Sequence, residues 1–218
     1  MINYQEFMGL EFFVQEGVLV PRPDTETLVE KVISYVKKSN LKNENIRILD
    51  IGTGSGAIGV SLGFYLKNAL VTAIDISDVA IETANINVKK LNLNNVIIKK
   101  ADIFNFNFNE SRIEDNKYDI VVSNPPYIES HEISCLPKEV SEYEPKLALD
   151  GGKDGLLYYR QIVNVFKEIH SLNSMLSVEI GYNQSMSVKE IFENSNIFNK
   201  IELDKDLSGI YRVVSGFL

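Results

Sequence analysis

Short apolar segments alternate with longer amphipathic ones along most of this chain, and this alternation limits its possible folds more than any other feature. The apolar segments have the length of buried strands and cover residues 46–51, 69–74, 96–99, 118–123 and 174–180. The amphipathic segments have the spacing of helices and cover residues 25–38, 56–66, 78–91, 155–170 and 184–194. Strands that alternate with helices form βαβ units, so the pattern predicts a parallel sheet covered on both faces.

The two ends of the chain depart from this alternation. Residues 198–203 and 211–217 are apolar runs joined by a connection too short for a helix, which predicts an antiparallel hairpin at one edge of the sheet. Residues 10–20 alternate around Glu16-Gly17 and predict a small N-terminal hairpin. We therefore expect a Rossmann-like α/β fold whose seven-stranded sheet is mostly parallel with an antiparallel edge strand. Its expected division is an N-terminal hairpin and linker, residues 1–22, followed by one domain, residues 23–218.

Charge and cysteine content narrow the class of protein. The chain has 22 basic and 30 acidic residues and a net charge of −8, which opposes stable nucleic-acid binding because such binding depends on neutralising phosphates. The single cysteine, Cys135, excludes an internal disulfide and favours a reducing, cytoplasmic location. No apolar run approaches the roughly 18 residues of a spanning helix, so we expect no membrane partner.

A glycine-rich loop follows the first strand of the predicted sheet. Glycine permits a tight turn close to a ligand, and the amino end of the next helix offers free N–H groups, so the loop predicts a nucleotide-like cofactor. Asp75, at the end of the second strand, can accept hydrogen bonds from ribose hydroxyls. The same glycines match the dinucleotide fingerprint, so a nicotinamide oxidoreductase stays open. The expected cofactor contacts in the loop are Gly52, Thr53, Gly54, Ser55 and Gly56.

The fourth strand ends in Asn124-Pro125-Pro126-Tyr127, which we take as the candidate catalytic residues. The two prolines remove backbone donors and make a stiff turn at the carboxyl end of the sheet. The side-chain oxygen of Asn124 and the carbonyl of Pro125 form a pair of acceptors for a planar NH₂ group, on which Tyr127 can stack. The target is therefore an amide or an exocyclic amine.

Asp50 and the glycines that follow it, in the pattern D-x-G-x-G-x-G, resemble the first motif of class I S-adenosylmethionine-dependent methyltransferases. The resemblance implies S-adenosylmethionine as the cofactor, with Asp50 near its methionine amino group. It also implies that Asp102 and the adjacent Ile103 approach the adenine. The alternative readings, in which Asp50 caps a turn and Asp102 caps a short helix, remain open.

The loop combined with Asn-Pro-Pro-Tyr is shared by adenine-N6 methyltransferases of DNA and RNA, some guanine-N2 enzymes, and the protein-(glutamine-N5) methyltransferases that modify release factors. The last group is the HemK/PrmC family, and three stretches of this chain are similar to its segments. They are residues 17–26, residues 143–156 with Tyr159-Arg160, and residues 178–181 with Gln184. That family usually has an N-terminal helical domain, and by this resemblance the chain starts near the point where that domain gives way to the catalytic one.

The resemblance implies transfer of a methyl group to the side-chain amide nitrogen of the Gly-Gly-Gln glutamine in a release factor, a protein that acts in a ribosomal context. It assigns substrate binding to Asn124, Pro125 and Tyr127, and it places Asn124 among the cofactor contacts as well. Arg22 either contacts the cofactor carboxylate or the protein substrate, or only pairs with an acidic neighbour. An adenine-N6 methyltransferase acting on RNA or DNA, an NAD-dependent oxidoreductase and a cofactor-binding module without catalysis are the alternatives.

Isolated residues that often carry chemistry have weaker claims. His131, His170 and Cys135 have no companions at ligand spacing, so we expect no metal site and no cysteine nucleophile. The N-terminal phenylalanines at positions 7, 12 and 13 are more typical of a small hairpin core than of a cofactor wall.

Overall fold

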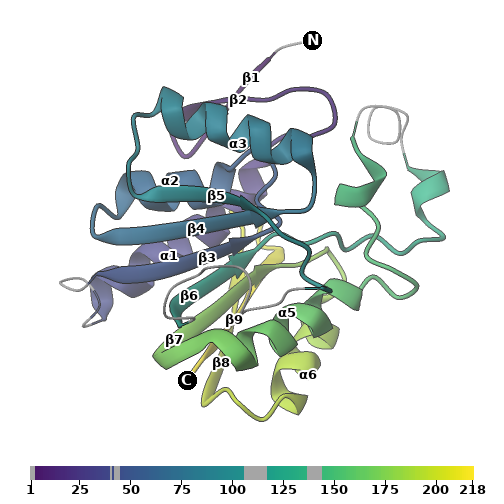
Figure 1. Cartoon of the computed structure of the whole chain (residues 1–218). Helices are drawn as coiled ribbons and strands as arrows, with labels where there is room; N and C mark the ends of the chain where they lie inside the picture. The colour runs from purple at the N-terminus through teal and green to yellow at the C-terminus, as the bar shows by residue number, and fades with distance from the viewer. Residues whose placement is uncertain (1–2, 40, 42–44, 106–116, 137–143) are drawn as a thin grey trace.

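The computed structural model describes residues 3–39, 41, 45–105, 117–136 and 144–218 (Figure 1). Within them, the central sheet has seven strands in the order β5-β4-β3-β6-β7-β9-β8. Strands β5, β4, β3, β6 and β7 run parallel, and β9 runs antiparallel to both of its neighbours. The strands are β3 (Ile46–Ile51), β4 (Ala69–Asp75), β5 (Val96–Lys100), β6 (Tyr118–Ser123), β7 (His170–Glu179), β8 (Lys200–Lys205) and β9 (Tyr211–Phe217).

Helices cover both faces of the sheet (Figure 1). Helices α1 (Glu26–Lys38), α2 (Ala57–Tyr65) and α3 (Asp78–Lys90) lie on one face, and α5 (Leu157–Ile169) and α6 (Ser185–Asn194) lie on the other. Short 3-10 turns are η1 (Pro23–Thr25), η3 (Ile133–Cys135) and η4 (Lys146–Ala148). Among the helices of the described residues, none has the length and apolar content needed to cross a membrane.

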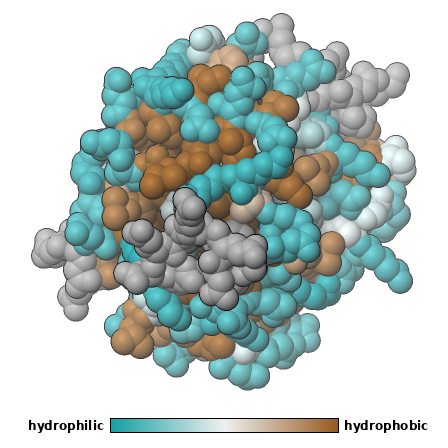
Figure 2. Space-filling view, in the orientation of Figure 1, coloured by the Kyte–Doolittle hydropathy of each residue, from teal (hydrophilic) through white to brown (hydrophobic). Residues whose placement is uncertain are grey.

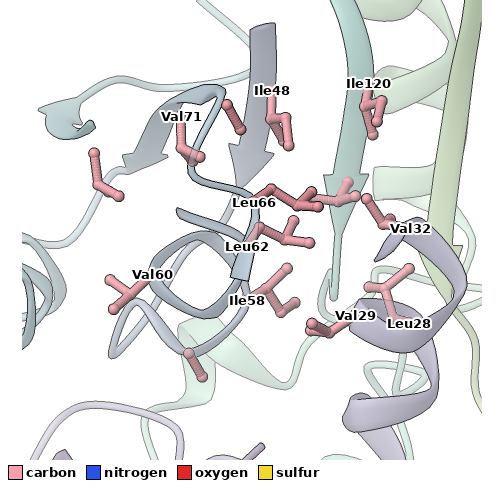
Figure 3. Close-up of a cluster of buried hydrophobic side chains, with 14 of the residues drawn as sticks. Leu28, Val29, Val32, Ile48, Ile58, Val60, Leu62, Leu66, Val71 and Ile120 are labelled. Carbon is pink, nitrogen blue, oxygen red and sulfur yellow. The ribbon is translucent and has the colours of Figure 1, made fainter. Parts of the chain in front are cut away.

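The central strands are buried on both faces because successive side chains point to opposite sides of the sheet. Ile48 and Ile120 pack with α1 and α2, as Figure 3 shows, whereas the adjacent Leu49 and Val121 pack with α5 and α6. On the outside, Figure 2 shows hydrophilic side chains over most of one side, with hydrophobic ones gathered near α2 and β5. The sheet therefore separates two cores, and the expected class of α/β fold is confirmed.

Strand β7 begins earlier than its apolar pattern indicates. It starts at His170, directly after α5, whereas the apolar run starts at residue 174. The additional residues are polar or exposed, and Leu172 is 90% exposed. Their pairing with β6 contains an irregularity between Tyr118 and Ile120. Hydrophobic periodicity cannot detect a strand segment whose side chains face water.

The N-terminal hairpin is present, but its position differs from the expected one. Strands β1 (Tyr4–Phe7) and β2 (Leu10–Phe13) pair antiparallel around Met8 and Gly9, so the prediction of a hairpin turning at Glu16-Gly17 is wrong. Met8 and Gly9 both have positive φ, which a tight two-residue hairpin turn requires. Gly17 also has positive φ, but it lies in the segment between β2 and η1 and closes no hairpin.

Asn87 of α3 attaches this hairpin to the rest of the protein. Its side-chain oxygen accepts from Phe13 N at 2.7 Å, and its amide donates to Phe13 O at 2.9 Å. The same amide donates to Ser55 O in the glycine loop at 2.8 Å. Phe7 and Phe12 are almost fully buried in the core, as expected of hairpin core residues. One buried side chain thus joins the hairpin to the loop.

The expected antiparallel pairing at the far edge of the sheet is confirmed, with one difference in order. The reversed strand is β9, which lies between β7 and β8, so the outermost strand β8 runs in the same direction as the parallel strands. In the β8–β9 hairpin it is the second strand, β9, that pairs with β7. The reversed strand therefore lies one position inside the edge of the sheet.

Leu62→Ala tests the packing between α2 and the sheet. Leu62 is fully buried in the core that Figure 3 shows, so we expect the free energy of unfolding to fall by about 2–5 kcal/mol. Urea titration followed by circular dichroism measures this change. The control Leu172→Ala, at a 90% exposed position, is expected to change the value by less than about 0.5 kcal/mol. Equal losses in both variants would contradict the assignment of the core.

Candidate active site

A cavity of about 270 Å³ opens at the carboxyl ends of β3, β4 and β6. This is where open parallel sheets place their ligands, because the loops that leave neighbouring strands meet there. Most of the predicted site residues line this cavity, but Asp50, Gly56 and Tyr127 do not. Those that line it are Arg22, Gly52, Thr53, Gly54, Ser55, Asp75, Asp102, Ile103, Asn124, Pro125 and Pro126. Residues 17–19, 21, 25, 145, 147, 148, 158 and 162 are among the others that line it.

The glycine loop is shaped by three left-handed residues, Gly52, Gly54 and Gly56, with φ of 72°, 55° and 87°. Residues with a side chain rarely adopt these angles, which explains the spacing of the glycines. At Gly56 an added Cβ would also lie 2.9 Å from a side-chain carbon of Val60. Gly56 therefore allows the turn and close packing with α2, although it does not line the cavity.

The amide groups of the loop are largely used within the protein. The N–H groups of Gly52 and Thr53 donate to Ile74 O at 2.9 and 3.0 Å. Gly54 N donates to Asp75 Oδ2 at 2.9 Å, and Gly56 N donates to Thr53 O at 2.8 Å. These donors are consequently occupied by protein acceptors in this conformation.

Asp50 lies beneath the loop and is fully buried. Its Oδ2 accepts from Thr53 Oγ1 at 2.6 Å and from Gly59 N at 2.9 Å, whereas Oδ1 has no hydrogen-bond partner. Burial raises the pKa of Asp50 to about 6, and the two hydrogen bonds oppose this shift. The structure thus gives Asp50 contacts that brace the loop, and the methionine-contacting role implied by the family resemblance stays a prediction.

Asp75 and Asp102 both line the cavity while organising the loops around it. Asp75 Oδ1 accepts from Ser77 N at 2.9 Å, in addition to the bond from Gly54. Asp102 accepts from Phe104 N at 2.9 Å and from Asn105 Nδ2 at 2.7 Å. Each carboxylate oxygen has a further lone pair, so turn-forming and ligand-binding roles are compatible.

Asn124 stands at the cavity directly after β6. Ser123 Oγ donates to Ile51 O at 2.7 Å, which joins the end of β6 to the end of β3. The side-chain amide of Asn124 donates from Nδ2 to Thr25 Oγ1 at 3.2 Å. Asn124, Pro125 and Pro126 all line the cavity. The structure therefore brings the predicted turn and the glycine loop to the same cavity.

Tyr127 has a different position from the expected one. Its ring packs with Gly181 beyond the end of β7: a Cβ added at Gly181 would lie 3.1 Å from Tyr127 Cδ2. Burial raises the pKa of Tyr127 to about 12, and the nearby Glu179 carboxylate contributes to this shift. Its predicted stacking on a substrate stays a prediction, because the ring does not line the cavity in this conformation.

Gln184 and three glycines hold the backbone of this turn, a role that the residue pattern alone did not reveal. Gln184 Nε2 donates to Tyr127 O at 2.9 Å and to Gly155 O at 3.2 Å. Its Oε1 accepts from Gly181 N at 3.1 Å. A Cβ added at Gly151 or Gly155 would lie 2.7 or 2.5 Å from Tyr127 backbone atoms. The only sequence signal for these residues was their place in the stretches that resemble a known family.

Arg22 forms an ion pair with Glu144 at the rim of the cavity. Burial raises the pKa of Glu144, and the Arg22 guanidinium opposes that shift. Among the described residues that line the cavity, Arg22 is the only cation. Arg22 therefore does pair with an acidic neighbour, and whether it also contacts a ligand stays a prediction.

The isolated histidines and the cysteine lie outside this cavity. His131 is exposed and lies 3.4 Å from Glu129 Oε2, Cys135 is exposed, and the ring of His170 packs against Phe166. Over the described ranges, no group of three or more histidine, cysteine, aspartate or glutamate residues is arranged to hold a metal ion.

Asp50→Asn tests the cost of burying this carboxyl group. Because its pKa is raised from 3.8 to about 6 on folding, its ionisation favours the unfolded chain. Stability that is present below pH 3.8 should be lost as the pH rises through about 6. We therefore expect the free energy of unfolding of the wild type to fall relative to Asp50→Asn over this range in urea titrations at a series of pH values.

The exposed substitution Asp78→Asn serves as the control, since its ion pair with Lys100 lies at the surface. Its difference from the wild type is expected to stay within about 1 kcal/mol at all pH values. Parallel pH curves for the wild type and Asp50→Asn would show that the buried carboxyl does not carry the shifted pKa.

Comparison with known proteins places the chain in a family. A family model described as a methyltransferase domain matches residues 42–202. Release factor glutamine methyltransferases of Clostridium acetobutylicum and Clostridium botulinum are 45% and 40% identical to it, over 96% and 98% of this chain. The matches cover 70% and 73% of those two proteins.

Solved structures show the same fold. The protein-(glutamine-N5) methyltransferase (release factor-specific) of Alicyclobacillus acidocaldarius aligns with a TM-score of 0.54 at 26% identity, covering 94% of this chain and 98% of that one. Human methyltransferase 10 domain containing protein aligns with a TM-score of 0.66 at 18% identity, covering 95% and 88%, and so shares the fold. With its methyltransferase domain, its cavity at the strand ends and these relatives, the chain belongs to the family of release factor glutamine methyltransferases.

Proposed function

We propose that this protein transfers the methyl group of S-adenosylmethionine to the side-chain amide nitrogen of the Gly-Gly-Gln glutamine in a peptide chain release factor. The observation that carries the proposal is the turn at Asn124, which lines the same cavity as the glycine loop. The names of the relatives support the substrate. To test the proposal, the wild-type protein is given radiolabelled S-adenosylmethionine with an unmodified release factor and, as a control, with bulk RNA. We expect label on the release factor, and label on the RNA alone would contradict the proposal.

The cavity suits a cofactor that carries hydroxyl and amino groups but no phosphates. The amides of Gly52, Thr53, Gly54 and Gly56 donate within the protein, so they do not form the cradle of free N–H groups that a pyrophosphate needs. Two carboxylates, of Asp75 and Asp102, face the cavity instead. They support contacts to the ribose and the adenine. Asp75 would suit the ribose of either cofactor, so the argument against a nicotinamide dinucleotide rests on the occupied amides alone.

The chemistry required of the protein is mainly positioning. An amide nitrogen is a poor nucleophile because its lone pair is delocalised, and S-adenosylmethionine supplies an electrophilic methyl group when bound. The Asn124 oxygen and the Pro125 carbonyl accept from the two amide hydrogens, which orients the nitrogen for attack. The new carbon–nitrogen bond would replace the bond between the methyl carbon and sulfur, whose electron pair would stay on the sulfur, and one amide proton would pass to water. No covalent intermediate with the protein is needed.

The same acceptors favour glutamine over glutamate. A glutamate carboxylate has no N–H donors, so it would leave both acceptors without partners at a cost of about 1–3 kcal/mol each. Asn124 is partly buried and Pro125 is buried, so water cannot readily replace both bonds. Discrimination by hydrogen bonding therefore needs no charged side chain at the reacting group.

A nucleobase substrate is less favoured than a protein one. An adenine-N6 methyltransferase could use the same turn, but it would need basic residues beside it to bind phosphates. Arg22, the only cation among the described lining residues, is paired with Glu144. Together with the net charge of −8, this supports a release factor as the partner.

The segment before α1 contributes to the same cavity. Val18, Pro21 and Arg22 line it, and the preceding hairpin is attached to α3 through Asn87. We infer that residues 23–218 form the catalytic domain and that residues 1–22 form a hairpin and linker that wall one side of its site.

Asn124→Ala tests the role of the turn. Loss of the side-chain acceptor should leave the binding of S-adenosylmethionine within about twofold, measured by calorimetry, and reduce methyl transfer by about 100-fold or more. The assay measures transfer of radiolabelled methyl groups to an unmodified release factor.

The exposed residue Asn194, in the last turn of α6, supplies a matched control. Asn194→Ala is expected to keep wild-type activity. Full activity of Asn124→Ala would remove the assigned role.

A further inference from the structure

Glu179 is a buried carboxyl group next to Asn124 that the proposed chemistry has not used. It is the last residue of β7 and is 3% exposed. The parallel register pairs Ser123 with Val178, so the next residues of the two strands, Asn124 and Glu179, lie beside each other. Glu179 itself does not line the cavity. It is therefore placed to act on a ligand only through its neighbours.

The side chains of Thr25 and Asn124 are the hydrogen-bonding neighbours of this carboxylate, and both favour its ionised form by lowering its pKa. Its Oε2 is left without a hydrogen-bond partner. The cation Arg212 attracts this carboxylate from a distance, but its ion pairs are with Asp24 at 2.9 Å and with Asp206 at 3.0 Å. A buried carboxylate without an ion pair is costly, which makes its place beside Asn124 informative.

The direction of the hydrogen bonds in this group follows from their chemistry. Thr25 Oγ1 accepts from Asn124 Nδ2 at 3.2 Å, so the single hydroxyl hydrogen of Thr25 is free to be donated to Glu179. An ionised carboxylate can only accept. Glu179 therefore requires the Asn124 amide to turn its NH₂ inward, which leaves the Asn124 carbonyl oxygen for the cavity.

We propose that Glu179 is a positioning residue that determines specificity: as the final acceptor of the Asn124–Thr25 network, it holds the Asn124 oxygen toward the substrate and so selects an amide over a carboxylate. The inference rests on the proposed function, because it concerns how the glutamine is recognised. Without a carboxylate at this position, the Asn124 amide can rotate by half a turn and present its NH₂ to the cavity. The site would then accept a glutamate more readily than a glutamine.

The decisive variant is Glu179→Gln, which keeps the size of the side chain but adds two donors. We expect its kcat/KM for a release factor to fall by about 100-fold, with the binding of S-adenosylmethionine unchanged. The sharper readout is a binding ratio, the affinity for the unmodified release factor divided by the affinity for the same protein with glutamate in place of its Gly-Gly-Gln glutamine. We expect this ratio to fall at least about tenfold in Glu179→Gln.

Thr25 provides a second test that leaves Glu179 in place. Thr25→Val removes the hydroxyl at nearly constant volume and should lower the binding ratio, whereas Thr25→Ser keeps the hydroxyl and should restore it. Glu190→Gln, an exposed position on α6, is the matched control and should behave as the wild type. If Glu179→Gln does not fold, the two Thr25 variants decide the question.

The pH profile gives an independent readout. Burial raises the pKa of Glu179 to about 7; Arg212 and the two hydrogen bonds oppose the shift, and Asp24 adds to it. Its charge in turn raises the pKa of Tyr127 and of Tyr159, and the Tyr159 hydroxyl donates to the backbone oxygen of Glu179 at 3.1 Å. Protonation converts an acceptor into a donor, so kcat/KM of the wild type should fall as the pH drops below about 7. Glu179→Gln should lack this decline.

The outcomes separate the inference from the proposed function. A wild-type protein that does not label the release factor contradicts the proposed function itself. If the wild type is active, the variants decide the inference. Glu179→Gln and Thr25→Val variants that lose the same affinity for the unmodified release factor and for its glutamate form would show a merely structural role and overturn the inference. A lower binding ratio in both variants, restored in Thr25→Ser, supports it.

Discussion

The parallel pairing of β3 with β4 and β6 is the constraint on which the rest of the site depends. Ile51 pairs with Ile74 on one side and with Ser123 on the other, so the three strands end at the same level. The glycine loop, Asp75 and Asn124 follow these ends directly. A shift of one residue in either ladder would turn alternate side chains to the opposite face and separate these groups. Packing on both faces of the sheet is what prevents that shift.

Two buried carboxyl groups support this site from below. Asp50 lies under the glycine loop, and Glu179 lies beside the turn at Asn124. Each has one oxygen without a hydrogen-bond partner, and burial raises the pKa of each. Both positions reduce the stability of the ionised protein. Each carboxyl group draws hydrogen-bond donors of a loop at the site inward. The stability lost by burying these groups therefore accompanies the geometry that the site needs.

The sheet and the helices could be predicted because burial on both faces leaves a strong periodic pattern. The pattern was insufficient where side chains face water, as at the start of β7, and where two glycine turns competed, at Gly9 and Gly17. Within the site, the predicted loop and turn reach one cavity, but the ring of Tyr127 packs outside it. No local pattern indicates which way a ring turns, because neighbouring elements decide that.

The sequence by itself determined the α/β fold, the glycine loop, and the turn at Asn124 that can hold an NH₂ group, since each depends on the spacing or local conformation of consecutive residues. Only the tertiary structure decided which acids contact the loops and which way the Asn124 amide is held. Thr25 and Glu179 are distant from Asn124 in sequence, and the strand register and the packing of α1 bring them together. Hydrogen bonds between such distant residues depend on positions in space that residue spacing does not encode.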